Sequence, residues 1–323
     1  MEVVSRKRLM LFTGSANPAL AEEVAELLGV RLGGLERLVF ANGEIYVRPT
    51  DSVRGTDCFI LQSHSDPINF HIMEQLIAID ALKRASARRV TAVVPYFGYS
   101  RQDKKVRPRE SIAARLMGDM FMTAGANRIA SVDLHTGQIQ GFIHKPFDHL
   151  TALPVFTDYL RDRLKGPTTV VSPDAGGVKR AEKYARQLDA YVAFIHKRRE
   201  ADLHNESEAL AVIGKVEGRH AIIVDDIIDT AGTAVNAVKL LKSKGALSVS
   251  IAATHGILSG PAVDRIMHSD IEELVISNTI PAPPGIESLD KVRVLSIAPL
   301  LAEAIQAIFM ESSVSQIFLG DNL

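Results

Sequence analysis

Short runs of β-branched and other apolar residues alternate with amphipathic, helix-like runs along almost the whole chain of 323 residues. Strand–helix alternation of this kind predicts an α/β fold with a mainly parallel sheet covered by helices on both faces. Because ligands of such sheets bind at the carboxyl ends of strands, polar residues that follow a strand are the first candidates for a site. The strand candidates include Leu9–Thr13, Cys58–Gln62, Val90–Pro95, Arg128–Val132, Thr169–Ser172, Tyr191–Ile195, Ala221–Val224, Leu247–Ala252, Leu274–Ser277 and Val292–Ser296.

The two halves of the chain carry similar strand–turn–helix units and meet near Asp148-His149-Leu150. We therefore predict two similar α/β domains, residues 1–150 and residues 151–323. We expect about the last 15 residues to pack back on the first domain. Residues that favour helix ends are found in both halves: Asn17-Pro18 and Ser111 at N-termini, Gly125 and Gly245 at C-termini.

Composition restricts the class of protein. The chain is 46% hydrophobic and 23% charged, which is typical of a globular protein, and its formal net charge of -1 argues against a general nucleic-acid-binding surface. Cys58 is the single cysteine, so neither an intrachain disulfide nor a cysteine metal cluster is expected. No apolar run approaches the length of a membrane span. We therefore expect a cytoplasmic enzyme that binds neither nucleic acid nor membrane.

The segment Ile222–Thr233 carries the strongest functional signal. An apolar run leads into Asp225 and Asp226, and a turn rich in Thr and Gly then precedes a helix-like run. The backbone N–H groups of residues 229–233, at a helix N-terminus, are suited to a phosphate, and the two acids are suited to accept hydrogen bonds from vicinal hydroxyls. The segment thus indicates a sugar phosphate, most simply ribose 5-phosphate. The alternative is that the acids only cap a helix, with Asp229 as the N-cap, but a cap requires neither two further acids nor this turn.

A basic loop follows the strand Val90–Pro95. It contains aromatic residues and a glycine turn, then Arg101 and Gln102, and further Lys and Arg residues up to Arg109. A bare run of charge is usually a solvated surface loop, but the position after a strand favours an anion site. Arg101 and Gln102 side by side would suit a nucleotide triphosphate, because Arg binds phosphate oxygens with a bidentate fork.

Two further strand ends carry candidate metal ligands. Asp133 and His135 are two apart on the strand that begins at Arg128, so their side chains should point the same way, toward a divalent metal or a metal-bound phosphate. Without context, a structural role for this pair is equally expected. Asp174 lies in the turn Ser172–Gly177, where it is placed to bind Mg²⁺ and where adjacent glycines allow the backbone to approach a pyrophosphate.

A basic cluster, His196–Arg199, follows the strand Tyr191–Ile195 and opens a polar segment. Such a cluster can be an exposed hinge, or a lid whose cations reach the substrate on closure. The cluster by itself does not decide between these two roles.

Together these runs resemble the ribose-phosphate diphosphokinase family (phosphoribosyl pyrophosphate synthetases), and its phosphate-activated class I in particular. The resemblance covers nearly the whole chain, and several short motifs in one order are more specific than any single motif. The matching motifs are Phe40–Glu44, Tyr99–Lys105, Asp133–His135 with Gln138–Phe142, Ser172–Gly177, Lys197–Arg199 and Asp225–Thr233.

The resemblance implies two domains of the type I phosphoribosyltransferase-like fold, with ATP on the N-terminal side and ribose 5-phosphate on the C-terminal side. It implies transfer of the diphosphoryl group of ATP to the C1 hydroxyl of ribose 5-phosphate, with Mg²⁺ as cofactor, in a hexamer built from dimers. The implied roles are adenine contacts from a neighbouring subunit by Phe40, Asn42 and Glu44; ATP phosphate binding by Arg101 and Gln102; Mg²⁺ contacts by His135, Asp174 and Asp133; catalysis by Lys197 and Arg199; ribose 5-phosphate binding by Asp225, Asp229, Thr230, Ala231, Gly232 and Thr233; and allosteric binding of phosphate and ADP by Ser52, Arg54, Ser313 and Ser315.

Two other functions share the sugar-phosphate loop. A phosphoribosyltransferase would consume the product, but those proteins are generally one such domain with a small hood and need no second domain with Arg101, Gln102 and His135. A non-enzymatic regulator should lack Lys197, Arg199 or the acids of the loop, all of which are present. The sequence also lacks the P-loop and dinucleotide-binding glycine motifs. The diphosphokinase reaction is therefore our prediction.

Overall fold

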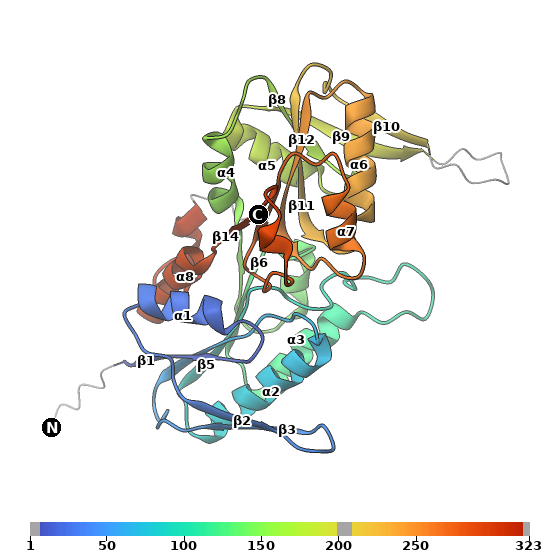
Figure 1. Cartoon of the computed structure of the whole chain (residues 1–323). Helices are drawn as coiled ribbons and strands as arrows, with labels where there is room; N and C mark the ends of the chain where they lie inside the picture. The colour runs from blue at the N-terminus through green and yellow to red at the C-terminus, as the bar shows by residue number, and fades with distance from the viewer. Residues whose placement is uncertain (1–6, 199–208, 319–323) are drawn as a thin grey trace. The chain divides into compact units, whose positions relative to one another are not determined.

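The computed structural model describes residues 7–198 and 209–318 (Figure 1). Within these residues the chain forms two compact α/β units. Unit 1 contains the chain up to Thr151, Thr279–Pro281 and the chain from Ser296, and unit 2 contains Ala152–Asn278 and Ala282–Leu295. The chain thus returns to unit 1 at Ser296, earlier than predicted, since only about the last 15 residues were expected to pack on the first domain. Among the helices of the described residues, none is long and apolar enough to cross a membrane.

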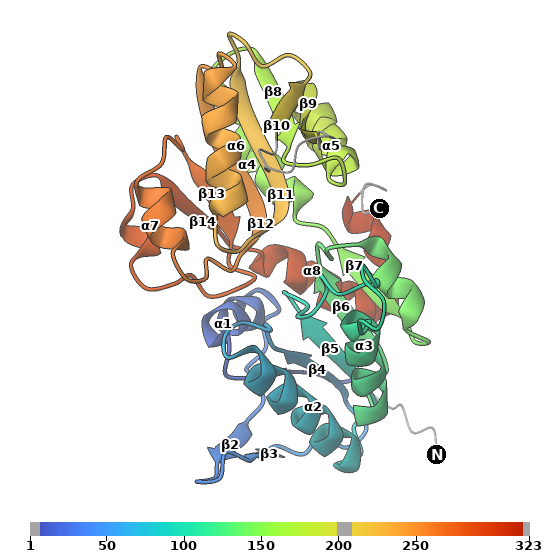
Figure 2. The ribbon, with the colours of Figure 1, turned by 90° about the vertical axis from the view of Figure 1, so that its right-hand side faces the viewer.

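Unit 1 is built on a five-stranded parallel sheet with the strand order β1-β4-β5-β6-β7. A separate antiparallel hairpin, β2–β3, lies beside the second helix (Figure 2). The elements are β1 (Leu9–Thr13), α1 (Pro18–Leu27), β2 (Leu35–Val39), β3 (Ile45–Pro49), β4 (Asp57–Leu61), α2 (Ile68–Arg84), β5 (Arg89–Val94), α3 (Ala113–Ala124), β6 (Arg128–Val132), η1 (Gly137–Phe142), β7 (Phe147–Leu150), α8 (Ala298–Met310) and η3 (Val314–Phe318).

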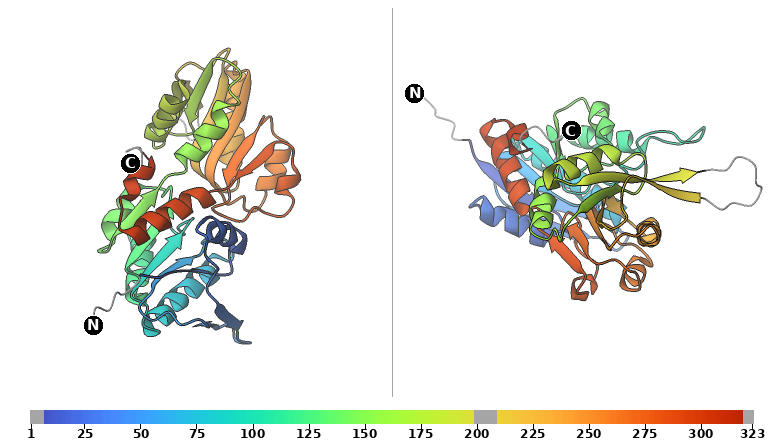
Figure 3. Two further views of the ribbon diagram at one scale, coloured as in Figure 1. Left: turned by 90° about the vertical axis from the view of Figure 1, so that its left-hand side faces the viewer. Right: turned by 90° about the horizontal axis from the view of Figure 1, so that it is seen from above.

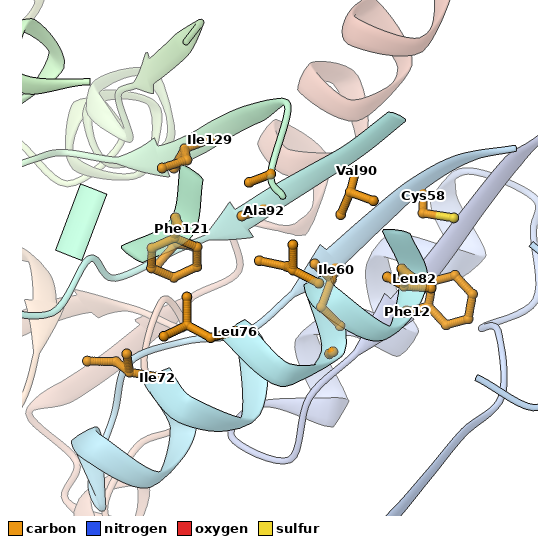
Figure 4. Close-up of a cluster of buried hydrophobic side chains, with 14 of the residues drawn as sticks. Phe12, Cys58, Ile60, Ile72, Leu76, Leu82, Val90, Ala92, Phe121 and Ile129 are labelled. Carbon is orange, nitrogen blue, oxygen red and sulfur yellow. The ribbon is translucent and has the colours of Figure 1, made fainter. Parts of the chain in front are cut away.

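Helices cover both faces of the unit 1 sheet. On one face, apolar side chains of α2 and α3 pack on the strands, and Figure 4 shows Leu76 of α2 and Phe121 of α3 beside Ile60 and Ala92 of the sheet. Each large apolar side chain that is fully buried in this way stabilises the fold by about 1.5–3 kcal/mol. Helices α1 and α8 pack against each other on the other face, where Leu11 of β1 is completely buried. The apolar character of α8 explains why the chain returns to unit 1 at this helix.

Unit 2 is built on a seven-stranded sheet with the order β10-β9-β8-β11-β12-β13-β14, in which only the β9–β10 pair is antiparallel. Helices α5 and α6 lie on opposite faces of this sheet (Figures 2 and 3). The elements are α4 (Leu153–Arg161), β8 (Thr168–Ser172), α5 (Val178–Leu188), β9 (Tyr191–Arg198), β10 (Ala209–Ile213), β11 (His220–Ile228), α6 (Gly232–Ser243), β12 (Ser248–Gly256), α7 (Ala262–Met267), β13 (Leu274–Ser277), η2 (Ile286–Ser288) and β14 (Val292–Leu295).

In both units the strand order reverses at the first strand of the sheet, β1 in unit 1 and β8 in unit 2. In unit 2, β8 lies between β9, the next strand in the chain, and β11, which comes after the β9–β10 pair. In unit 1, β4 lies on one side of β1, and Leu32 forms a parallel bridge to Leu11 on the other side. Such a reversal opens a crevice at the carboxyl ends of the two central strands, which is where α/β sheets bind ligands. The prediction of two similar, mainly parallel α/β domains is confirmed.

Local signals for helix ends were mostly reliable. The Asn17 side chain accepts a hydrogen bond from Leu20 N at 3.4 Å and proline follows at the start of α1. Gly125, with a φ of 107°, is the left-handed C-cap of α3. Ser111 was the wrong residue, because the N-cap of α3 is Ile112 and no side chain of the described residues bonds there. The hairpin β2–β3 was not expected, since its half-exposed residues lack a clear apolar alternation.

Candidate functional site

The strand β11 carries its two acids past the end of β8. Its ladder with β8 ends at the pair Ile223 and Val171, whereas its ladder with β12 continues to Ile228. The strand is therefore longer than the predicted Ala221–Val224, and Asp225 and Asp226 lie on its unpaired edge at the crevice of unit 2. The Asp226 side chain is buried and that of Asp225 is one-third exposed.

The turn between β11 and α6 leaves a helix N-terminus uncapped. Helix α6 begins at Gly232 after Ala231, which has the left-handed φ of 59°, and no side chain in the described part of the chain caps it. The alternative that Asp229 is the N-cap is wrong; Asp229 instead accepts a hydrogen bond from Ser259 Oγ. Thr230 and Thr233 are exposed in the same turn. Uncapped N–H groups, two hydroxyls and the positive end of the helix dipole together favour an anion such as phosphate.

A guanidinium supports this turn from the next loop. Arg265 Nη1 donates to the carbonyl oxygen of Thr230 at 2.8 Å and lies 3.2 Å from the position that a Cβ on Gly232 would occupy. Its positive charge adds to the field at the N-terminus of α6. A Cβ at residue 232 would therefore make a tight contact with this guanidinium, and Arg265 would have to shift by a few tenths of an ångström.

The turn after β8 forms a second part of the unit 2 crevice. Asp174 Oδ1 accepts hydrogen bonds from the N–H groups of Gly176 and Gly177, at 2.8 and 3.0 Å, and the Asp174 carbonyl accepts from Ser172 Oγ at 2.6 Å. The second carboxylate oxygen, Oδ2, makes no hydrogen bond to the described residues, and the residue is exposed. Asp174 thus has one oxygen that fixes the turn and one that is available to a hard cation.

Arg180, in the first turn of α5, binds both acids of β11. Its Nη1 atom is 3.0 Å from Asp225 Oδ1, and its Nη2 atom is 3.0 Å from Asp226 Oδ1. Burial and the neighbouring Asp226 carboxylate raise the pKa of Asp225 to about 7, and Arg180 acts in the opposite direction. Asp225 therefore titrates in the physiological range, which is common at functional sites.

In unit 1 the predicted adenine-binding residues share one hairpin turn between β2 and β3. Phe40 N donates to Glu44 O at 2.9 Å, and Asn42 Oδ1 accepts from Glu44 N at 3.1 Å. The Phe40 ring is 51% exposed and meets Tyr46 edge to face, with the ring centroids 6.3 Å apart. The turn thus presents an aromatic face, an amide and a carboxylate to solvent together.

Arg101 and Gln102 lie in the loop between β5 and α3, and both are exposed. The preceding tight turn is fixed from below by His64, whose Nδ1 accepts from Gly98 N at 2.9 Å and whose Nε2 faces Gln75 Oε1 at 3.0 Å. Complete burial lowers the pKa of His64 to about 4, so the ring is neutral at pH 7. A buried, neutral histidine thus anchors the loop that carries Arg101 and Gln102.

The expected geometry of Asp133 and His135 is wrong. Strand β6 ends at Val132, and Asp133 has a left-handed φ of 38°, so the two residues do not alternate along a strand. The chain turns here because Asp133 N donates to Leu150 O and Leu134 N donates to His149 Nε2. Among residues 7–198 and 209–318, no three His, Cys, Asp or Glu side chains are gathered as a metal site.

The predicted lid residues are only partly within the structure. Lys197 lies in β9, in register with Leu210 of β10, so the basic cluster begins on one strand of an antiparallel pair. Arg199 lies outside the described residues.

The four predicted allosteric residues lie in two places in unit 1. Ser52 and Arg54 are exposed in the loop between β3 and β4. Ser313 and Ser315 have their hydroxyls 2.8 Å apart and line a cavity of about 270 Å³ that Ser52 and Arg54 do not line. The other residues around this cavity are Arg128, Gln140, Phe147, Asp148, His149, Ser312 and Val314.

Comparisons with known proteins agree with this geometry. Residues 9–125 match the family described as the N-terminal domain of ribose phosphate pyrophosphokinase, and residues 201–319 match the phosphoribosyl synthetase-associated domain. The ribose-phosphate pyrophosphokinase of Bifidobacterium longum is 54% identical over 316 residues, which cover 97% of this chain and 93% of that protein. That of Streptomyces avermitilis is 52% identical over 319 residues, 98% of each chain.

This chain belongs to the ribose-phosphate pyrophosphokinase family. The family predicted from the motifs is therefore confirmed. The crystal structure of phosphoribosylpyrophosphate synthetase from Mycobacterium smegmatis has a TM-score of 0.89 and 49% identity, and the match covers 95% of this chain and 100% of that one. The two-unit fold described above is thus the fold of a ribose-phosphate pyrophosphokinase.

Sequence analysis did not assign roles to three residues that shape the site. Arg180 and Arg265 are basic residues on helices, and His64 follows a strand, yet each makes its contact with residues 30 or more positions away. The available signal was weak. A pair of adjacent acids requires a nearby cation, but the sequence does not say which one.

Proposed function

We propose that this chain is a ribose-phosphate pyrophosphokinase that transfers the β,γ-diphosphoryl group of ATP to the C1 hydroxyl of ribose 5-phosphate, giving 5-phosphoribosyl 1-pyrophosphate and AMP. The observation that carries the proposal is the β11–α6 segment, where a pair of carboxylates is followed by an uncapped helix N-terminus at the crevice of a parallel sheet. The family match over nearly the whole chain supports the same reaction.

In this proposal the 5-phosphate binds the turn at the N-terminus of α6. The N–H groups of Asp229, Thr230, Ala231, Gly232 and Thr233 surround it, and the Thr230 and Thr233 hydroxyls add hydrogen bonds. The Arg265 guanidinium, on the carbonyl of Thr230, raises the positive potential. The ring hydroxyls of the sugar then donate to Asp225, which lies four residues before Asp229 in the same segment. The support for this placement is the open edge of β11 and the absence of a side-chain cap on α6 within the described residues.

ATP binds residues of unit 1 in the proposal. The adenine meets Phe40, Asn42 and Glu44 of a neighbouring subunit, and the exposed Phe40 ring offers it a stacking surface. Arg101 and Gln102 bind the phosphates. The hydrogen bond from Gly98 N to His64 fixes their loop, so the two side chains that bind the phosphates are attached to an anchored turn. Catalysis of diphosphoryl transfer is mainly positioning and charge neutralisation, and this geometry supplies both.

Mg²⁺ is the proposed cofactor. The donor chemistry fits at Asp174, because an exposed carboxylate whose first oxygen already fixes its turn can offer the second to a hard cation, with water and substrate oxygens as further ligands. Asp133 supplies another carboxylate and His135 an imidazole for the metal or its bound phosphate. When bound, the cation lowers the pKa of the C1 hydroxyl and neutralises phosphate charge.

Lys197 and Arg199 are the proposed catalytic cations. They stabilise charge that develops on the migrating diphosphoryl group, and a cation that acts only in the transition state lowers the barrier without tightening substrate binding. The support is the family's basic motif at this place and the backbone of Lys197, which lies in the β9–β10 pair in register with Leu210.

We further propose that the enzyme is cytoplasmic and works as a hexamer built from dimers, with phosphate and ADP as effectors. Ser313 and Ser315 on their cavity supply hydroxyl donors, and Ser52 and Arg54 supply a hydroxyl and a guanidinium from the exposed β3–β4 loop. Because these two groups are separate on the chain described here, subunit contact is the proposed means of combining them.

The experiment is incubation of the protein with Mg²⁺, ATP and ribose 5-phosphate, followed by chromatographic measurement of AMP. We expect AMP and 5-phosphoribosyl 1-pyrophosphate in equal amounts, and neither without the sugar. Formation of ADP with phosphorylated sugar would contradict the proposal. Consumption of 5-phosphoribosyl 1-pyrophosphate with a nucleobase, and no AMP from ATP, would indicate the phosphoribosyltransferase alternative.

A further inference from the structure

Two carboxylates on consecutive residues of β11 share one guanidinium. Arg180 places a separate nitrogen on Oδ1 of each, at 3.0 Å in both cases. Neighbouring residues of a strand normally direct their side chains to opposite faces. Here both are reached by one planar fork, which only arginine provides. The contact therefore fixes the orientation of both acids at the edge where the ladder with β8 has ended.

One carboxylate oxygen of Asp225, Oδ1, accepts two hydrogen bonds from N–H groups of the protein. Oδ1 accepts from Arg180 Nη1 at 3.0 Å and from Asp226 N at 2.9 Å. No guanidinium or backbone N–H group of the described residues donates to Oδ2. The Asp226 carboxyl lies within hydrogen-bonding reach of the Asp225 side chain, which is one-third exposed. The arrangement thus turns one oxygen of Asp225 toward the protein and leaves the other to a ligand that donates.

The environment of Asp225 and Asp226 disfavours ionisation of both carboxyl groups at once. Burial and the adjacent Asp226 carboxylate both favour protonation of Asp225, and its pKa of about 7 is reached with the Arg180 charge already present. Among the charged groups of the described residues that act on Asp225, Arg180 is the one that lowers its pKa. Ala253 of β12 is in register with Asp225, the buried His255 is in register with Ile227, and Asp174 of the β8 turn is bound to Gly176 and Gly177. Arg180 is thus the cation that favours ionisation of Asp225 and that also contacts Asp226.

We propose that Arg180 is a positioning residue that keeps Asp225 and Asp226 ionised side by side and aims the outer oxygen of Asp225 at the vicinal hydroxyls of ribose 5-phosphate. This inference rests on the proposed function. An ionised carboxylate only accepts hydrogen bonds, whereas a protonated one would have to donate to a sugar that itself offers donors. Binding of the sugar therefore weakens as the pH falls through the pKa of Asp225.

The inference predicts the behaviour of two variants. In Arg180→Gln the side chain is polar but shorter and uncharged, so the pKa of Asp225 rises further. One unit of that rise corresponds to about tenfold weaker sugar binding at a pH well below the wild-type pKa of Asp225, and to a smaller loss between the two pKa values. In Arg180→Lys the charge remains and the fork is lost, so the pH midpoint should stay near that of the wild type while affinity falls uniformly.

The experiment measures the KM for ribose 5-phosphate, the KM for ATP and kcat from pH 6 to pH 9, together with calorimetric binding of ribose 5-phosphate alone. For Arg180→Gln we expect the KM for the sugar to rise about fivefold or more at pH 7 and to recover toward pH 9. Its KM for ATP should change less than twofold. The double variant Arg180→Gln with Asp226→Asn should move the midpoint back down, because a charge that opposes ionisation of Asp225 is removed.

A purely structural role for Arg180 gives a different pattern. The KM for both substrates would rise, or kcat would fall, by the same factor at every pH, and Asp226→Asn would not restore the profile. That result would overturn the proposal. Failure of the proposed function is seen separately: wild-type protein would then neither bind ribose 5-phosphate in the calorimeter nor form AMP with it.

Discussion

His64 should make the stability of unit 1 depend on pH between 7 and 5. The ring is 1% exposed, its Nδ1 accepts from Gly98 N, and it stacks on Phe121 with the centroids 5.7 Å apart. Because Gly98 N–H is the donor, the proton of the neutral ring lies on Nε2 and is donated to Gln75 Oε1. The fold holds this neutral tautomer, and protonation would place two donors face to face at Nδ1.

The sign and size of this pH effect on the free energy of unfolding follow from the pKa values of His64 in the folded and unfolded states. Burial lowers the pKa in the folded state to about 4, while the unfolded chain takes up the proton near 6.5. Stability from this residue is complete above pH 6.5 and is lost as the pH falls toward 4, because the unfolded state then binds more protons. At 1.36 kcal/mol per pKa unit the whole effect is about 3 kcal/mol, and about 2 kcal/mol of it is lost between pH 7 and pH 5.

The assay is urea unfolding followed by far-ultraviolet circular dichroism at pH 7, 6 and 5. Other groups also titrate in this range, so the measured quantity is the difference in pH dependence between the wild type and His64→Asn. Asparagine keeps an acceptor for Gly98 N–H but does not titrate. We expect the variant to be less stable at pH 7 and to lose about 2 kcal/mol less than the wild type on going to pH 5. Parallel pH profiles for the two proteins would refute the argument that His64 is buried as a neutral acceptor.

Three further predictions concern the proposed chemistry. Lys197→Ala should lower kcat by a factor that corresponds to about 3–5 kcal/mol, with little change in calorimetric ribose 5-phosphate binding, while Arg198→Ala serves as the neighbouring control; retention of a tenth of the activity would show that Lys197 is not catalytic. Asp229→Ala combined with Thr233→Val should raise the KM for ribose 5-phosphate far more than that for ATP, and equal changes in steady-state assays would mean that the turn is only structural. Arg54→Ala should blunt both activation by phosphate and inhibition by ADP in a protein that remains folded, and a wild-type enzyme that ignores phosphate and sediments as a monomer or dimer would contradict the class I assignment.

The sequence by itself determined the alternation of strands and helices, the two similar α/β units and the sugar-phosphate segment. These features were predictable because each is encoded by neighbours in the chain. A strand, two acids, a turn and a helix fit within residues 220–243. The Asn17 cap and the Gly125 C-cap were readable for the same reason, since a cap is decided within one helical turn.

Tertiary structure decided which distant groups meet. Arg180 and Asp225 are 45 residues apart, and His64 and Gly98 are 34 apart, so no local pattern pairs them. The return of the chain to unit 1 at Ser296 depends on an apolar face of α8 that fits α1. Asp133 was misjudged because contacts with β7 turn its backbone out of the strand. Local sequence sets which conformations a segment favours, but packing between segments selects the charge partners and backbone turns. In each unit these partners set a pKa value, that of His64 in unit 1 and that of Asp225 in unit 2.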